Sequence, residues 1–290
     1  MKRENFEITC EELISHFIRL YLVPLSPYAE GSDINTKNHS GFTPFHIVCK
    51  NGHVKILKHI LDNAADLNID LNAKDNQGLS AFHWVCLRGD TKLAKILVKN
   101  SMLDFSARDN SESTSFHYAC RYAHSEIAEL LIENHANLNI ELDAKDNEGW
   151  TAFHWTCIKG LFRIAEVLMT NSCEFKIDLN AKINDGRSGF HLACWNGHSE
   201  IGYILMRNSA AFSIDLNARD NFGMTAFHLA CWWGKVNTVE ILISNAEMFN
   251  LDLKAKTKLG KTGLDLATME GKSGVISVIK SKRLLCVLDF

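Results

Sequence analysis

Segments that would place the chain in or across a membrane are missing from this sequence. No apolar run approaches the ~20 residues that a membrane-spanning helix needs. Glu11, Glu12, His16 and Arg19 interrupt the region in which a secretory signal peptide would carry its apolar core. We therefore expect a soluble intracellular protein without membrane contacts. We place it in the cytoplasm, with the nucleus as the alternative.

A dominant sign of charge is also missing. The 31 Lys and Arg residues nearly balance the 34 Asp and Glu residues, for a net charge of −3, and the signs are scattered along the chain. Such a sequence has no basic field that would attract nucleic acid or an anionic lipid surface. We expect no nucleic-acid partner.

Motifs of catalysis are absent as well. The chain contains no glycine-rich phosphate loop, nucleophile-elbow motif or zinc-protease helix. We therefore expect no enzymatic activity, no cofactor and no small-molecule substrate.

What the sequence does contain is one pentad, Phe-His-x-x-Cys, in six copies. Successive histidines are 37, 34, 37, 37 and 37 residues apart, and a degenerate copy at 264–268 follows after 37 more. This periodicity indicates stacked repeats, which build a long surface rather than one deep catalytic cleft. The repeated residues are His46, His83, His117, His154, His191 and His228, with Cys49, Cys86, Cys120, Cys157, Cys194 and Cys231.

The histidine and cysteine of each copy are predicted to be structural. A disulfide framework would not place cysteines at one site of every repeat, and free cysteine packs as a small buried hydrophobe, typical of a reducing compartment. Zinc needs four ligands at about 2.0–2.3 Å, whereas neighbouring helices lie about 8–10 Å apart, so adjacent pairs can hardly share an ion. A metal site or a Cys-His nucleophile is the remote alternative, and six identical copies argue against a unique catalytic centre.

Each repeat is predicted to contain two short helices and a turn. In the first copy Thr43 can cap a helix, Pro44 suits its first turn and Gly52 can end it. Apolar residues within 56–61 then follow the three-four spacing of a buried helical face. Asp, Asn and Gly in the stretch 71–78 indicate a turn before the next repeat.

This unit resembles the ankyrin repeat. The segment Thr43-Pro44-Phe45-His46, followed by Gly52-His53, is similar to the Thr-Pro-Leu-His and Gly-His signatures of that family. The resemblance implies an all-α fold: an ankyrin-repeat solenoid of stacked helix-turn-helix units joined by β-turn or hairpin loops. It also implies that the histidines hydrogen-bond the backbone of the turns, and that a protein partner binds on the concave face. Most copies exceed the family period of about 33 by four residues, inserted between the second helix and the turn.

We divide the chain into an N-terminal helical cap (1–33), an array of about seven repeats (34–283) and a C-terminal tail (284–290). We expect fourteen or fifteen helices in one curved stack without a second domain. The third repeat departs from the pattern, with Glu112 and Ala123 at positions where the other repeats have glycine, and we predict a kink or faster opening around 105–124.

Positions at which the repeats disagree are the candidate binding residues. Two lie before the helix-ending glycine and one after the turn glycine, and their varied character indicates exposure, on the face that the resemblance assigns to binding. Aromatic and apolar residues gather there towards the C-terminus, as an interface would require. Trp84 and Trp155 occupy a different position and are predicted to belong to the core. The candidate partner-binding residues are Trp150, Ile158, Trp195, Phe222, Met224, Trp232, Trp233, Arg88, Arg121 and Tyr122.

The function predicted from the sequence is a non-catalytic protein-protein interaction scaffold or adaptor. The alternative is a regulatory or targeting subunit of an enzyme complex, such as a ubiquitin ligase or a phosphatase. No appended box or catalytic domain in the sequence supports that alternative.

Overall fold

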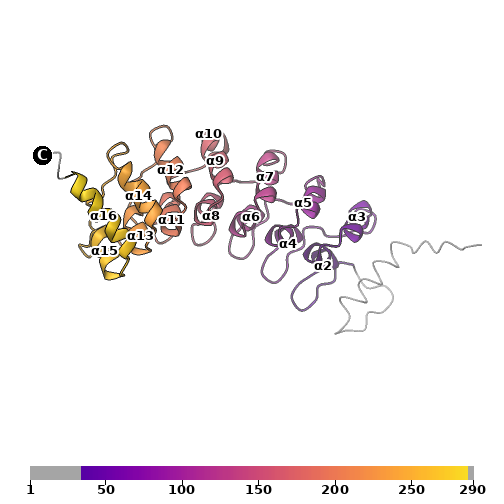
Figure 1. Ribbon diagram of the computed structural model, residues 1–290. Helices are drawn as coiled ribbons and strands as arrows, with labels where there is room; N and C mark the ends of the chain where they lie inside the picture. Colours follow the sequence, from indigo (N-terminus) through magenta and orange to yellow (C-terminus); the bar gives the residue numbers. More distant parts are fainter. Residues whose placement is uncertain (1–33, 287–290) are drawn as a thin grey trace, which may run out of the picture. The chain divides into compact units, whose positions relative to one another are not determined.

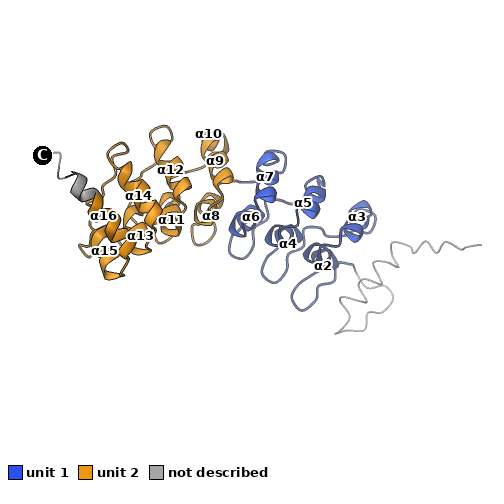
Figure 2. Ribbon diagram, in the orientation of Figure 1, with its two compact units in different colours: residues 1–141 blue, residues 142–290 orange. Residues whose placement is uncertain are grey.

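The computed structural model describes residues 34–286, and the side chains of 34–281. The proposed cap at 1–33 lies outside this range. The described chain is helical, with isolated β-bridges such as Lys74–Ser80 in place of strands. Contacts divide the protein into two compact units, unit 1 (Met1–Glu141) and unit 2 (Leu142–Phe290) (Figure 2). Each unit is built from the same repeat.

Unit 1 contains three described repeats. Their first helices are α2 (Pro44–Asn51), α4 (Ala81–Arg88) and α6 (Ser115–Arg121), which pack on one another in that order (Figure 1). Their second helices pack on one another in a second row, drawn above the first in Figure 1: α3 (Val54–Asp62), α5 (Thr91–Leu97) and α7 (Ser125–Glu133).

Unit 2 contains four repeats of the same design. The first helices are α8 (Ala152–Lys159), α11 (Gly189–Asn196), α13 (Ala226–Trp232) and α15 (Gly263–Met269). The second helices are α9 (Phe162–Thr170), α12 (Ser199–Arg207), α14 (Val236–Ser244) and α16 (Ser273–Cys286), with a short α10 (Ser172–Phe175) after α9. Helix α16 continues three residues into the segment that we assigned to the C-terminal tail. In both units we call the surface formed by the first helices and the turns before them the first-helix face.

The helix boundaries follow from the residues that the sequence singles out. Thr43 accepts the amide of His46 and begins α2, and Gly52 ends it with a φ of 79°. In the third repeat Glu112 and Ala123 adopt φ values of 62° and 61°, a region that costs L-residues about 1 kcal/mol. These two residues therefore do occupy glycine positions, as predicted from the register. No helix within 34–286 combines the length and the apolar character needed to cross a bilayer.

The four extra residues of most repeats form a loop that an asparagine of the preceding repeat holds in place. The side-chain amide of Asn180 donates to the carbonyl of Ser213 (2.8 Å), and its oxygen accepts the amide of Asp215 (2.8 Å). Asn217 makes the same pair of bonds to Asn250 and Asp252. The residue whose carbonyl is bound has a positive φ, as in Ser213 (52°), which lets the loop turn towards the asparagine. Consecutive repeats are thus joined by polar bonds as well as by apolar packing.

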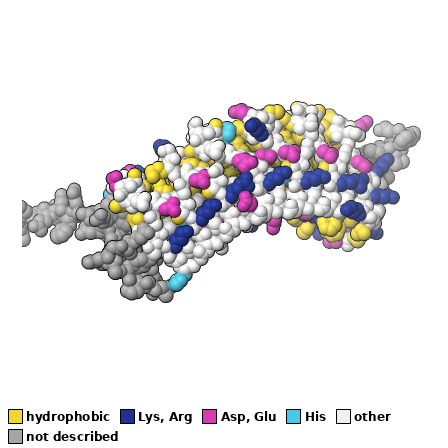
Figure 3. Space-filling view, turned by 180° about the vertical axis from the view of Figure 1, so that it is seen from behind, with side chains coloured by type: hydrophobic (Ala, Val, Ile, Leu, Met, Phe, Trp, Pro, Cys, Tyr) yellow, Lys and Arg dark blue, Asp and Glu magenta, His cyan; other side chains and the backbone are white. Residues whose placement is uncertain are grey.

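A row of Lys and Arg side chains lies beside a row of Asp and Glu side chains (Figure 3). The ammonium groups of Lys37 and Lys74 donate to the carbonyls of Lys74 and Arg108, one repeat further on. Arg108 forms an ion pair with Glu141 at 2.7 Å. The two rows offset each other's field, so this surface does not present a strong charge of one sign.

Candidate functional site

The repeated histidines use both ring nitrogens within the protein. Nδ1 of His46 accepts the backbone amide of Thr43 (3.2 Å), so the proton of the neutral ring lies on Nε2, which donates to the carbonyl of Leu79 (3.0 Å). The ring is buried, and this burial lowers the pKa of His46. A neutral ring bonded on both sides ties the start of one repeat to the turn of the next.

The other repeats use the same arrangement. The Nε2 atoms of His83, His154, His191 and His228 lie 2.9 to 3.3 Å from carbonyl oxygens of the following turn. In the last repeat Asp265 replaces the histidine and accepts the hydroxyl of Thr262 at 2.7 Å. With both nitrogens engaged, these rings are poor candidates for metal ligands or general bases.

The repeated cysteines are buried and unpaired. The thiols of Cys49 and Cys194 are fully enclosed, and burial raises the pKa of both. A thiolate is the nucleophilic form of cysteine, so a thiol kept protonated and enclosed is inert. The residues that recur in every repeat therefore build the fold, and a functional site has to be found among the residues that vary.

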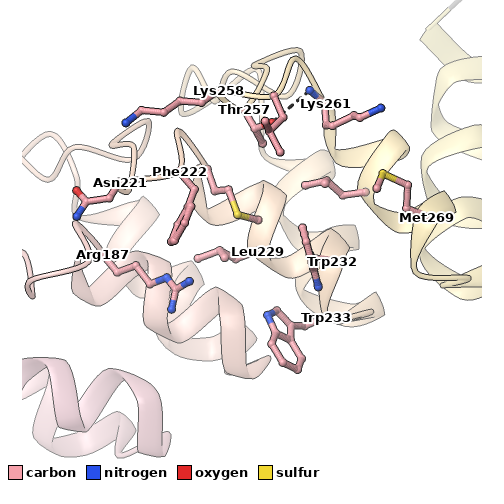
Figure 4. A pocket seen from close by; sticks show the side chains of 13 residues that line it. Arg187, Asn221, Phe222, Leu229, Trp232, Trp233, Thr257, Lys258, Lys261 and Met269 are labelled. Atoms are coloured by element: carbon pink, nitrogen blue, oxygen red, sulfur yellow. Dashed lines mark hydrogen bonds between the residues drawn. The ribbon is translucent and has the colours of Figure 1, made fainter.

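An apolar groove opens on the first-helix face of unit 2, over the last two repeats. It has a volume of about 560 Å³. Figure 4 shows Phe222, Leu229 and Trp232 around a common space, with Trp233 at one edge and Lys258 and Lys261 on the opposite edge. Phe222 is 58% exposed and Trp233 is 50% exposed, so a large aromatic surface is open to solvent.

The groove lies where the residue at the position after the repeated histidine is leucine. The first repeat has Ile47 at this position, and the second to fourth have the aromatic residues Trp84, Tyr118 and Trp155. The rings of the second and third repeats reach back to the turn. Trp84 Nε1 donates to Asp75 (3.0 Å) and the Tyr118 hydroxyl donates to Asp109 (2.7 Å). In the last repeats the position holds Leu192, Leu229 and Leu266, and the latter two line the groove. The smaller leucine leaves open the space that a ring fills elsewhere.

The turn aspartate of this region has a different partner. The Asp220 side chain is fully buried, and its Oδ2 lies 3.5 Å from Nε of Arg187, which also contacts Asp185 at 3.1 Å. The Arg187 guanidinium lies over the Trp195 ring, 4.7 Å from its centre. Arg187 thus forms one wall of the groove and holds Trp195 beside it.

The structure brings part of the predicted set together. Phe222, Met224, Trp232 and Trp233 line the groove, and Trp195 packs against the same apolar cluster. The other candidates lie elsewhere: Trp150 and Ile158 at the start of unit 2, and Arg88, Arg121 and Tyr122 in unit 1.

Two expectations about burial were wrong. Met224 is only 7% exposed because it packs with Leu229 and Leu266 beneath the groove, so the variability of the position after the turn glycine does not mean exposure. Trp84 and Trp155, expected in the core, are half-buried. They lie on the first-helix face, where Trp155 stacks on Trp150 with ring centres 4.1 Å apart.

Four residues that line the groove were not predicted from the sequence: Leu229, Leu266 and the turn residues Lys258 and Leu259. A signal was available in the position after the histidine, which is aromatic in the second to fourth repeats and Leu in the last three. A second signal was Leu259, an apolar residue at the tip of a polar turn that is 85% exposed in the structure.

The comparisons with known proteins agree with this architecture. A family profile described as ankyrin repeats, in three copies, matches residues 20–109, 67–141, 139–220 and 190–283. This chain belongs to the ankyrin repeat family. Proteins of the family generally mediate protein-protein interactions.

One similar solved structure is the ankyrin repeat domain of Bcl-3, described as a unique member of the IkappaB protein family. It has a TM-score of 0.64 and 21% sequence identity, over 83% of this chain and 100% of that one. At this identity the likeness concerns the fold alone. A search of curated protein sequences found no significant match.

Proposed function

We propose that this ankyrin repeat protein is a non-catalytic interaction scaffold or adaptor that holds a protein partner in the groove of unit 2. The observation that supports the proposal is the groove itself, an apolar surface with exposed Phe222, Trp233 and Met269 around a half-buried Trp232. Exposed aromatic surface of this kind costs solubility unless something covers it, and Trp is enriched among the residues that dominate binding energy.

The aromatic residues in and beside the groove differ in how far they also support the fold. Trp195 and Trp232 pack against Met224, Leu229 and Leu266, so replacing them would disturb the fold along with the surface. Phe222 and Trp233 are at least half-exposed, and their truncation should change the surface alone. They are therefore the better probes of binding.

The test compares Phe222→Ala/Trp233→Ala with Tyr203→Ala/Met248→Ala in quantitative affinity purification with the full chain. Tyr203 and Met248 are exposed apolar residues of unit 2 that do not line the groove. We expect one or more proteins to be lost with the groove variant and kept with the control. The affinity of the purified partner should fall about 30-fold or more, equivalent to about 2 kcal/mol. Equal recovery with both variants would contradict the proposal.

A further inference from the structure

The charged residues along the groove share one sign. Its lining includes Arg187, Lys258 and Lys261 and no Asp or Glu. Arg187 is already balanced by Asp185 and by the buried Asp220. The two lysines lie on the turn between α14 and α15, along the edge of the groove opposite Trp232 and Trp233 (Figure 4).

These lysines have little opposing charge within the described part of the chain. Neither takes part in a recorded ion pair there, and both residues are exposed. Lys261 interacts electrostatically with Asp265, a carboxylate that already accepts hydrogen bonds from the backbone amide and the hydroxyl of Thr262 at the start of α15. The result is an apolar floor with a positive edge, on a chain whose net charge is −3.

We propose that the groove binds a short acidic segment of a protein partner. A bulky apolar side chain of the segment lies on Leu229 and Trp232, and neighbouring Asp or Glu side chains face Lys258 and Lys261. This assignment rests on the proposed function and adds the chemistry of the partner. Complementary charge at the edge of an interface favours encounter with the right partner and disfavours like-charged ones.

The size of the groove favours a segment over a folded surface. A volume of about 560 Å³ lies within the range of pockets that enclose small ligands, so it accommodates a few side chains. Two lysines are few for a nucleic acid, whose binding grows with the number of phosphates neutralised. The floor formed by Leu229 and Met224 is recessed below Phe222 and Trp233, where an extended segment can reach it and a flat bilayer surface cannot.

The first experiment is a selection of twelve-residue peptides from a random displayed library against the full chain. Parallel selections use Leu229→Trp, which fills the groove with the ring that Trp84 provides in unit 1, and Phe222→Ala/Trp233→Ala. The second variant keeps the test valid if the first does not fold. We expect peptides that depend on the groove and combine a bulky apolar residue with at least two Asp or Glu residues.

The second experiment measures the affinity of the most enriched peptide by fluorescence anisotropy. Lys258→Glu/Lys261→Glu should weaken binding at least tenfold. The matched control is Lys254→Glu/Lys280→Glu, with the same change in net charge at two exposed lysines that do not line the groove. It should change the affinity less than threefold. Thermal unfolding of each variant checks that the fold is intact.

The outcomes separate this inference from the proposed function. Groove-dependent peptides without an acidic bias would overturn the inference and leave the groove as a protein-binding site. No groove-dependent enrichment would overturn both. Tighter binding of a fluorescent oligonucleotide, or of vesicles with 30% phosphatidylserine, that is lost in Lys258→Glu/Lys261→Glu would replace the peptide by another class of ligand.

Discussion

The first-helix faces of the two units use aromatic residues in opposite ways. In unit 1 the ammonium of Lys50 lies 4.3 Å from the centre of the Phe42 ring and 4.2 Å from that of Trp84. Trp84 and Tyr118 each donate to a turn aspartate. At the end of unit 2, Phe222 and Trp233 have large exposed fractions around an open groove.

The difference shows that aromatic content alone does not identify a binding surface. A ring whose polar group is bonded to its own repeat fills space and stabilises the turn. Where leucine takes that position, the turn aspartate Asp220 meets Arg187 instead, and the vacated space becomes a groove. Leucine in place of an aromatic ring at this position, as at Leu229 and Leu266, therefore accompanies the open face.

Acid should have the largest effect and should act on both units. Burial lowers the pKa of His46 and His83 in unit 1 and of His191 and His228 in unit 2, with that of His83 lowered to about 4. The unfolded rings take up protons below about pH 6.5, whereas the folded rings resist. Stability is therefore complete above pH 6.5 and falls as the pH drops towards 4.

Each such histidine contributes a slope of up to about 1.4 kcal/mol per pH unit. Urea unfolding followed by circular dichroism between pH 7.5 and 4.5 measures the total slope. His83→Gln should reduce the slope while lowering stability at pH 7.5, and an unchanged slope would show that His83 does not titrate on unfolding.

The second prediction concerns a variant of unit 1 that has leucine after the repeated histidine, as the open groove of unit 2 does. Trp84→Leu removes the ring, its bond to the buried Asp75 and its contact with Lys50. We expect the free energy of unfolding to fall by about 3 kcal/mol. The variant loses the packing of the ring, and a carboxylate oxygen of Asp75 loses its hydrogen-bond donor. Trp233→Ala, at the exposed edge of the groove, is the control and should cost less than about 1 kcal/mol. Equal costs would mean that the two faces do not differ as described.

The third prediction distinguishes the two ring-aspartate bonds of unit 1. Burial, reinforced by Asp109, raises the pKa of Tyr118, so its hydroxyl stays protonated. In Asp109→Asn this hydroxyl can rotate and accept from the new amide. The indole N–H of Trp84 can only donate, so in Asp75→Asn it would face the N–H groups of the new side-chain amide, which are also donors. Chemical unfolding should show a cost of about 2 kcal/mol for Asp75→Asn and less than about 1 kcal/mol for Asp109→Asn. The reverse order would contradict the assigned bonds.

The smallest expected effect is a gain. Ala123→Gly replaces an L-residue at a φ of 61° by the residue that the other repeats have there, and should stabilise unit 1 by about 0.5 to 1 kcal/mol. Gly160→Ala, at the equivalent position of unit 2 with a φ of 74°, should destabilise. Hydrogen exchange around 105–124 should slow in Ala123→Gly, and unchanged exchange there would count against the strain.

The sequence predicted the repeated framework well because the same or a chemically similar residue recurs at most structural sites. Thr43, His46, Cys49 and Gly52 each do in the structure what their chemistry indicates. The groove was only partly predictable, because it depends on volume left empty between a turn and a helix. Variability at Met224 suggested exposure, whereas its side chain packs beneath the groove. The asparagine bonds between repeats were missed, although Asn72, Asn180 and Asn217 recur in register.

The buried cysteines report on the local opening of the repeats that contain them. Each enclosed thiol, from Cys49 to Cys231, can react with an alkylating reagent only when its own repeat opens. Cys173 is exposed and reports the rate of the unhindered reaction. The ratio of the two rates, read peptide by peptide in a mass spectrometer, is the fraction of time that each repeat spends open. A single labelling experiment on the unaltered chain can therefore measure the open fraction of each of its six cysteine-bearing repeats, without a mutation or an added probe.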